Sequence, residues 1–367
     1  MHLYLHIPFC HRICPYCSFY KHTPGKTDLA AFVRALLAEA SHFHTSTEDH
    51  PPVETLYLGG GTPSMLSPAH LKTLMLGLGQ HFEFSDRSEI TLEANPATFT
   101  SRTADLYREL GVTRVSLGAQ SFDPDVLTTL GREHSPEQAV ESVHLLREAG
   151  MPSINIDLMF SIPGQDDDSW RTTLEEAAAL QPNHLSCYNL TYEEDTPFFE
   201  MQKDGRMNDD DERNARQFLL ADQLLGERGF HHYETSNYAQ PGHESQHNQA
   251  YWEGADYLGL GPSAVSTVDG VRWKNAPDTA AYLRMVDTVG HARTEEESLG
   301  ATELQTERIA LLLRTSKGVP LEVFSESATP VLARLQDQGL GETSKGRFRL
   351  VGDAPLFVDS IAAELIC

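Results

Sequence analysis

The feature that most restricts the fold is a strand–helix rhythm that repeats through the first half of the chain. Short apolar runs of the kind that form buried strands lie at 2–7, 53–59, 89–95, 112–120, 153–160 and 184–190. Between them are amphipathic segments, several of which begin with a Ser or Asp that can cap a helix. Strand followed by helix, repeated about six times, predicts parallel βα units. Periodicity alone leaves open whether the units form a full or partial barrel or an open doubly wound sheet.

The rhythm changes after residue 190. The acidic stretch 193–212 is expected to be a solvated loop that leads into a helix at 213–229. After about residue 276 the order becomes helix, helix, short hairpin and helix, which is typical of a small winged-helix-like domain. We therefore divide the chain into a barrel core at 1–190, a barrel extension at 191–285 and a C-terminal domain at 286–367.

Charge and hydropathy restrict the partners and the compartment. The chain carries 28 Lys and Arg against 53 Asp and Glu, a net charge of -25. A field of that sign repels polyphosphates, so we expect no nucleic-acid partner. No apolar run reaches bilayer-spanning length, and the start of the chain lacks the pattern of a signal peptide. We expect a cytoplasmic protein, in whose reducing surroundings clustered cysteines serve metal binding or catalysis rather than disulfides.

Three of the five cysteines lie together near the start of the chain. Cys10, Cys14 and Cys17 have the spacing C-x3-C-x2-C, which lets the thiolates of one loop converge on one centre. Structural zinc sites usually combine two short cysteine pairs, whereas Cys187 and Cys367 stand alone. Iron–sulfur clusters normally take four ligands, so three thiolates would leave one iron open to another ligand. Spacing favours such a cluster, with a three-cysteine zinc site as the alternative.

A glycine run, GGGTP at 59–63, follows the second predicted strand. Glycines at a strand end let the backbone approach a ligand, and their amides can meet an anionic group. On a parallel barrel this run and the cysteine loop would share the carboxyl-terminal face of the sheet. Glu93, Gln120 and Asp157 also fall at or near the carboxyl ends of predicted strands, where polar side chains more often belong to a site than to the core.

The cysteine spacing and the glycine run together resemble the radical S-adenosylmethionine (SAM) superfamily. There, three cysteines hold a [4Fe-4S] cluster, and the fourth iron takes the amino and carboxylate groups of SAM. The resemblance implies an α/β fold with a partial (β/α)6 TIM-like barrel, followed here by the winged-helix-like domain. It also implies that Cys10, Cys14 and Cys17 are the metal ligands, with the [4Fe-4S] cluster and SAM as cofactors.

Within that superfamily the chain is similar to the oxygen-independent coproporphyrinogen III oxidase group over nearly its whole length. The motifs of the group occur in order: YLHIPFCHRICPYC, YLGGGTPS, LEANP, VSLGAQSF, LGREH, NIDLMFSIPGQ, YETSNYA, HNQAYW and YLGLGPSA. The matches imply which residues line the cluster and SAM pocket: Tyr4, Tyr16, Gly60, Gly61, Thr62, Glu93, Gln120, Arg132 and Asp157. Thr191 and Val265 match positions that meet a second SAM molecule in the oxidase.

The group has two branches: oxidases that decarboxylate coproporphyrinogen III, and haem chaperones that pass haem to other proteins. Oxidases carry a further cysteine two residues after the third, where this chain has Phe19. Oxidases also carry an arm before the first strand, whereas this chain starts almost on that strand. The segment HNQAYW matches the motif H-N-x-x-Y-W of the chaperone branch. The resemblance therefore favours the chaperone branch, with coproporphyrinogen oxidation as the alternative.

His247, the histidine of that motif, offers an imidazole as an axial haem ligand, and its neighbours Tyr251 and Trp252 offer flat apolar surface for a porphyrin. With 17 histidines in the chain, any one is more often structural than a ligand. Many chaperones have a histidine where this chain has Val265, so His247 is the haem-ligand candidate. We expect haem or a porphyrin as cargo. The expected partners are haem-accepting proteins, an electron donor and, because family members can dimerise, a second copy of the chain. We assign no catalytic residue.

Overall fold

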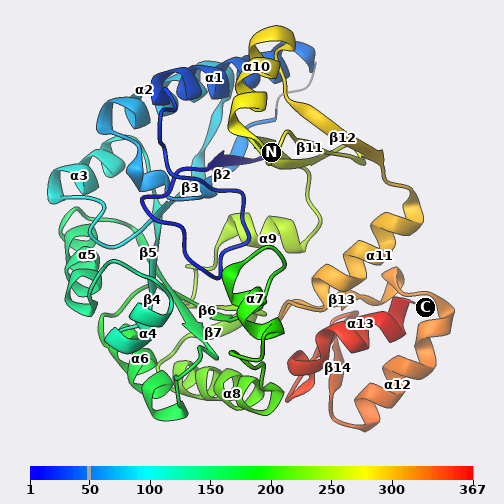
Figure 1. The fold of residues 1–367 in the computed structure, drawn as a ribbon. Helices are drawn as coiled ribbons and strands as arrows, with labels where there is room; N and C mark the ends of the chain where they lie inside the picture. The colour runs from blue at the N-terminus through cyan, green and yellow to red at the C-terminus, as the bar shows by residue number, and fades with distance from the viewer. Residues whose placement is uncertain (48–50, 367) are drawn as a thin grey trace.

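The structure is a computed structural model that describes residues 1–47 and 51–366. Its strands are β1 His2–Ile7, β2 Val53–Gly60, β3 Phe84–Ala94, β4 Arg114–Gln120, β5 Ser153–Phe160, β6 His184–Asn189, β7 His231–Glu234, β8 Asn237–Ala239, β9 Tyr257–Leu260, β10 Val265–Val268, β11 Val271–Asn275, β12 Arg293–Ser298, β13 Val319–Pro320, β14 Gly341–Ser344 and β15 Arg347–Leu350. The first twelve form one sheet, which curves into a partial barrel (Figure 1).

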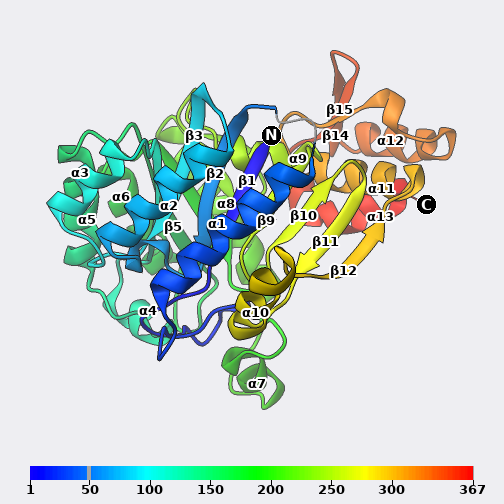
Figure 2. The same cartoon turned by 90° about the horizontal axis from the view of Figure 1, so that it is seen from above.

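The helices lie mainly outside this sheet (Figure 2). They are α1 Leu29–Ser46, α2 Pro68–His81, α3 Ser101–Glu109, α4 Pro124–Thr129, α5 Pro136–Glu148, α6 Asp167–Ala179, α7 Pro197–Lys203, α8 Asp211–Glu227, α9 Gln246–Trp252, α10 Thr279–Val289, α11 Ala301–Leu312, α12 Thr329–Asp337 and α13 Val358–Ile366. Side-chain caps begin many of them, for example Asp28 at α1 and Ser135 at α5. In the described part of the chain, no helix has both the length and the apolar character needed to span a membrane.

The six predicted strands are confirmed as β1 to β6, and each is parallel to the next. Their spatial order follows the chain order. Right-handed crossovers between strands in sequential order place all the connecting helices on one face, which is the barrel arrangement. A doubly wound sheet would instead reverse its order at a switch point. The partial barrel is therefore confirmed over the open sheet, and the carboxyl ends of six strands meet at one rim.

Later segments extend the sheet beyond both ends of this six-strand core. β9 pairs parallel with β1 and is followed outward by β10, β11 and β12. At the other end, β8 pairs antiparallel with β6, and β7 with β8. Strands β7 to β11 fall within residues 191–285, the segment expected to extend the barrel, whereas β12 lies beyond it. The individual strands were not predicted, because they are short and lie between irregular segments. The boundaries proposed at 190 and 285 stay predictions.

The C-terminal segment shows the predicted order of two helices, a hairpin and a helix in α11, α12, β14–β15 and α13. It has a separate apolar core, with Ile309, Val319, Phe348 and Leu365 each at most 3% exposed. Its link to the barrel includes the amide of Ser316, which donates to the carbonyl of Tyr233 at 2.9 Å.

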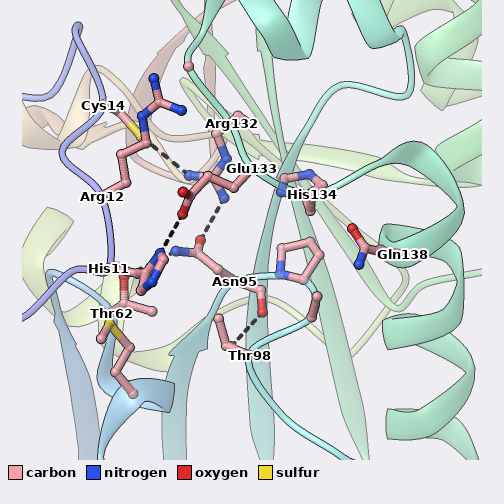
Figure 3. Close-up of a pocket in the computed structure, with 14 residues that line it drawn as sticks. His11, Arg12, Cys14, Thr62, Asn95, Thr98, Arg132, Glu133, His134 and Gln138 are labelled. Atoms are coloured by element: carbon pink, nitrogen blue, oxygen red, sulfur yellow. Dashed lines mark hydrogen bonds and ion pairs between the residues drawn. The ribbon is translucent and has the colours of Figure 1, made fainter.

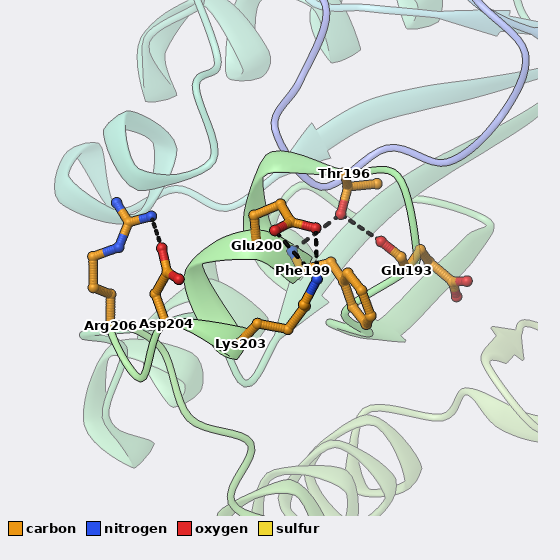
Figure 4. Close-up of polar contacts among 7 residues, drawn as sticks. All are labelled: Glu193, Thr196, Phe199, Glu200, Lys203, Asp204 and Arg206. Carbon is orange, nitrogen blue, oxygen red and sulfur yellow. Dashed lines mark hydrogen bonds and ion pairs between the residues drawn. The ribbon is translucent and has the colours of Figure 1, made fainter.

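The expectation that residues 193–212 form only a solvated loop is wrong, because α7 lies within them. Thr196 caps this helix: its hydroxyl accepts from the Phe199 amide at 3.2 Å and donates to the Glu193 carbonyl at 2.6 Å (Figure 4). On the helix surface, Lys203 donates to Glu200 at 3.2 Å. The helix has only seven residues and one fully buried side chain, so its apolar periodicity is too weak to detect in sequence.

Candidate functional site

A cavity of about 430 Å³ lies at the carboxyl ends of the parallel strands, a volume typical of small-molecule pockets. It gathers most of the predicted site residues: Cys10, Cys14, Tyr16, Cys17, Gly60, Gly61, Thr62, Glu93, Gln120, Arg132, Asp157 and Thr191. They come together because parallel strands deliver their following loops to one rim. Tyr4, His247 and Val265 do not line this cavity.

The loop after β1, which carries the cysteines, is bonded to the glycine run after β2. The Gly61 amide donates to the Ile7 carbonyl and the Thr62 amide to the Phe9 carbonyl, both at 2.8 Å. A Cβ at Gly61 would lie 2.7 Å from the carbonyl carbon of Pro8, closer than atoms can approach. Glycine at this position therefore lets the two loops touch.

Helix α7 supports the cysteine loop from the other side (Figure 2 shows it at the same end of the barrel). The Phe198 amide donates to the Pro15 carbonyl at 3.1 Å, and the Phe198 ring lies 6.2 Å from that of Tyr16. The cysteine loop is therefore held by the glycine run and by α7.

The three cysteines are partly buried, and the sulfurs of Cys10 and Cys14 have polar neighbours. The Thr62 hydroxyl lies 3.6 Å from the sulfur of Cys10, and Arg132 Nη1 lies 3.7 Å from the sulfur of Cys14. Burial raises the pKa of the Cys10 and Cys17 thiols. Loading a metal on them must therefore release protons. Among residues 1–47 and 51–366, no group of three His, Cys, Asp or Glu side chains has the arrangement of a metal-ion site.

Arg132 points from the loop between α4 and α5 toward Cys14, at the edge of a neighbouring hollow of about 370 Å³ (Figure 3). Its Nη2 donates to Asn95 Oδ1 at 2.7 Å and to the Gly118 carbonyl at 2.6 Å. Asn95 in turn donates to the Thr62 hydroxyl at 3.0 Å. One guanidinium thus joins the cysteine loop, the glycine run and β4.

Two carboxylates face the cavity from β3 and β5. Glu93 accepts from the Tyr57 hydroxyl at 2.8 Å and from the Gly60 amide at 3.1 Å. Burial raises the pKa of Glu93 to about 7, and the nearby charge of Asp157 also raises it. Asp157 accepts from Asn155 at 2.7 Å and from Ser116 at 3.0 Å. Both carboxylates are held in place and can accept hydrogen bonds from the amino or hydroxyl groups of a ligand.

The comparisons with known proteins agree with this geometry. Residues 4–177 match the Radical SAM superfamily. The structure of Escherichia coli coproporphyrinogen III oxidase (HemN), a radical SAM enzyme, is similar with a TM-score of 0.85 and 25% identity, covering 99% of this chain and 89% of that one. Heme chaperone HemW of Mycobacterium tuberculosis is 34% identical over 99% of this chain and 94% of its own. The chain belongs to the HemW family.

Two further HemW proteins extend the similarity. That of Bacillus subtilis is 31% identical over 98% of this chain and 97% of its own, and that of E. coli is 38% identical over 72% and 70%. As a radical SAM fold, the HemW family implies a [4Fe-4S] cluster and SAM. The residues present supply the donors that both groups need: three thiols line one cavity with the glycine run, and two fixed carboxylates line the same cavity.

The histidine of the HemW motif HNQAYW lies inside the fold, on α9. His247 is 1% exposed, and burial lowers its pKa to about 3, so the ring is neutral. Its Nδ1 is 2.6 Å from the Thr55 hydroxyl. Within the described part of the chain its Nε2 has no hydrogen-bond partner. In the tautomer whose proton is on Nδ1, this nitrogen has a free lone pair, but it lies inside the fold.

Several residues around the HemW cavity were not predicted from the sequence. Tyr57, Asn95, Ser116 and Tyr188 line it and were not singled out. Asn95 belongs to the quoted segment LEANP and could have been found there, whereas Tyr57 reads as part of an apolar strand. Conversely, the Tyr4 hydroxyl is 3.0 Å from His6 Nδ1 and not on the cavity wall.

Proposed function

We propose that this chain is a haem chaperone, which binds haem and passes it to haem-accepting proteins. The observation that carries the proposal is its similarity, over nearly the full length, to proteins named heme chaperone HemW. Phe19 adds support, because it lines the cavity, 67% exposed, at the position where the oxidase branch carries a further cysteine. We also place the protein in the cytoplasm.

Cys10, Cys14 and Cys17 hold the [4Fe-4S] cluster in this proposal. The glycine run and Thr62 contact the methionine part of SAM, while polar groups around the cavity contact the rest of the molecule: Tyr16, Glu93, Gln120, Arg132 and Asp157. Thr191, which lines the same cavity, is proposed to meet a second SAM molecule. When bound, the cluster supplies the electron that SAM cleavage requires, so an electron donor is a partner. A second copy of the chain is a further proposed partner.

His247 remains the candidate haem ligand. Its unpartnered Nε2 supports ligation, since a neutral imidazole nitrogen with a free lone pair is what haem iron accepts. Its burial adds a condition: α9 must move before haem iron can reach the ring. Tyr251 and Trp252 lie on the same helix and would move with it.

The test combines haem binding with porphyrin turnover. Anaerobically reconstituted protein should shift the Soret band of added haem and should leave coproporphyrinogen III unchanged. Replacing Cys10, Cys14 and Cys17 together by Ala should abolish bound iron and sulfide, whereas Cys187→Ala, a free cysteine outside the loop, should retain both. Absence of haem binding, or zinc in place of iron and sulfide, would contradict the proposal.

Coproporphyrinogen III oxidation is the second candidate, favoured by the TM-score of 0.85 to the E. coli oxidase. The chain would then remove two propionate carboxyl groups from its substrate. Formation of protoporphyrinogen by reconstituted protein with SAM and a reductant would select this activity over the chaperone function.

A further inference from the structure

A chain of hydrogen bonds runs from the cavity to the start of α9. Asp157 Oδ1 is 2.7 Å from Asn155 Nδ2, and Asn155 Oδ1 is 2.7 Å from His184 Nδ1. His184 Nε2 is 2.8 Å from the Tyr233 hydroxyl, which is 3.2 Å from the amide of Ser245. Ser245 is the N-cap residue of α9. This series of hydrogen bonds, the relay, joins β5, β6, β7 and α9, the helix that carries HNQAYW.

Each bond in this relay has only one workable direction. The Asp157 carboxylate accepts, so Asn155 must present its NH2 group to it and turn Oδ1 toward His184. A neutral His184 then carries its proton on Nδ1 and accepts at Nε2 from the Tyr233 hydroxyl. The Tyr233 oxygen, having donated its proton, accepts from the Ser245 amide. Donation therefore runs from α9 toward the cavity without a break.

The relay is buried along its length. His184 and Ser245 are 0% exposed and Asn155 is 1% exposed. Burial lowers the pKa of His184, and the charge of Arg114 acts in the same direction, which keeps the ring neutral. Where water cannot replace a lost partner, breaking one bond leaves its neighbours unsatisfied. A change in the hydrogen bond at either end of the relay therefore alters the bonds next to it.

A second connection reaches the same helix from the other cavity carboxylate. Glu93 accepts from Tyr57, whose ring stacks on His247 with centroids 5.1 Å apart. At the helix start, Glu89 Oε1 accepts from the His247 amide at 3.1 Å and from the Ser245 hydroxyl at 3.3 Å. Asp157, through the relay, and Glu93, through Tyr57, are thus both linked to residues of α9 or its N-cap.

We propose that Asn155, His184 and Tyr233 are positioning residues. They couple ligand binding at Asp157 to how firmly α9 is held against the barrel. A ligand that donates a further hydrogen bond to Asp157 holds its carboxylate more firmly, which strengthens the relay and keeps α9 in place. The identity of the ligands rests on the proposed function: SAM at Asp157, and haem at His247 after α9 moves. SAM and haem then bind in opposition, and each weakens the other by the same factor.

The first experiment follows amide hydrogen exchange of Gln246–Trp252 in reconstituted protein with and without SAM. SAM should slow exchange about fivefold or more in the wild type and should have little effect in Tyr233→Phe, which removes the relay hydroxyl. Tyr107→Phe is the matched control: this tyrosine is 1% exposed and its hydroxyl has no hydrogen-bond partner within the described residues. It should keep the wild-type response. Unchanged exchange of wild-type α9 on SAM binding would overturn the coupling, whether or not either variant folds.

The second experiment titrates haem with and without saturating SAM. The Kd for haem should rise about fivefold or more with SAM in the wild type and in Tyr107→Phe, and by less than about twofold in Tyr233→Phe. A Kd for haem that SAM does not change would overturn the proposed opposition of the two ligands, but not the chaperone function. Failure to bind haem, combined with slowed exchange of α9 on SAM binding, overturns the chaperone function and supports the coupling.

Discussion

Tyr57 stacks on His247 with an angle of 28° between the ring planes, and its hydroxyl donates to Glu93 at 2.8 Å. One side chain therefore touches both the cavity at the barrel rim and the helix that carries HNQAYW. His247 itself lies in the interior, behind the cavity wall. Its chemistry consequently depends on how firmly α9 is held.

Replacing His247 should affect haem binding and stability together. His247→Ala should weaken haem binding at least about tenfold, because the candidate ligand is lost. It should also lower the free energy of unfolding by about 2–4 kcal/mol, because the change removes a buried ring that stacks on Tyr57 and contacts Tyr251 edge-on. Soret titration and urea unfolding measure the two effects.

His231→Ala is the matched control for that change, since His231 is exposed on β7. It should alter neither quantity. Equal haem affinity in wild type and His247→Ala would remove His247 as the ligand and leave it as a packing residue.

Gly61→Ala should disrupt the contact between the glycine run and the cysteine loop. The added Cβ would meet backbone atoms of Pro8, Ile7 and Phe9 within 2.8 Å, so the loops must separate. We expect about 1–3 kcal/mol of lost stability and a lower content of iron and sulfide after reconstitution. Gly79→Ala, in α2 with nothing within 4 Å, should instead be neutral or stabilise by up to about 1 kcal/mol. Full cluster content in Gly61→Ala would contradict this role of the contact.

Arg132→Gln should weaken the cofactor site. The variant loses the guanidinium beside Cys14 and the paired bonds to Asn95 and Gly118, and it leaves their oxygens unsatisfied. We expect iron content to fall and the Kd for SAM to rise about tenfold. Arg108→Gln, whose Nη1 donates to the Val112 carbonyl at 2.7 Å away from the cavity, is the comparison. A SAM affinity equal to that of this control would show that Arg132 does not serve the cofactor.

We expect the free energy of unfolding to depend on pH through Glu39. It accepts from Tyr282, Gly261 and Asn275, yet burial raises its pKa from 4.5 to about 7. The folded state therefore holds more protons than the unfolded state between these values, so stability falls as the pH rises from about 4.5 through 7.

The measurement is the free energy of unfolding of wild type and Glu39→Gln at about pH 5 and about pH 8. The wild type should lose about 1–3 kcal/mol more than the variant over this interval. Glu93, whose pKa is also raised to about 7, contributes equally to both proteins and cancels in the comparison. Parallel pH curves would show that Glu39 does not titrate in this range.

The sequence predicted the cavity rim better than what lies behind it. Cys14, Gly61 and Asp157 each carry a short-range signal, such as cysteine spacing, a glycine run or a polar residue within an apolar strand. Parallel topology then brings such positions together whatever the details of packing. Tyr57 and His184 carry no such signal, since both sit within runs that read as ordinary buried strands.

Local order along the chain was enough to establish the βα units of the barrel, the helix–hairpin–helix tail and the thiol loop, because each follows from periodic burial and close spacing. Only the tertiary structure decided that His247 lies inside, beside a threonine 192 residues away, and that a relay from Asp157 ends at its helix. The reason is physical: such contacts depend on which distant segments share one interior, and no periodicity within a segment encodes that choice.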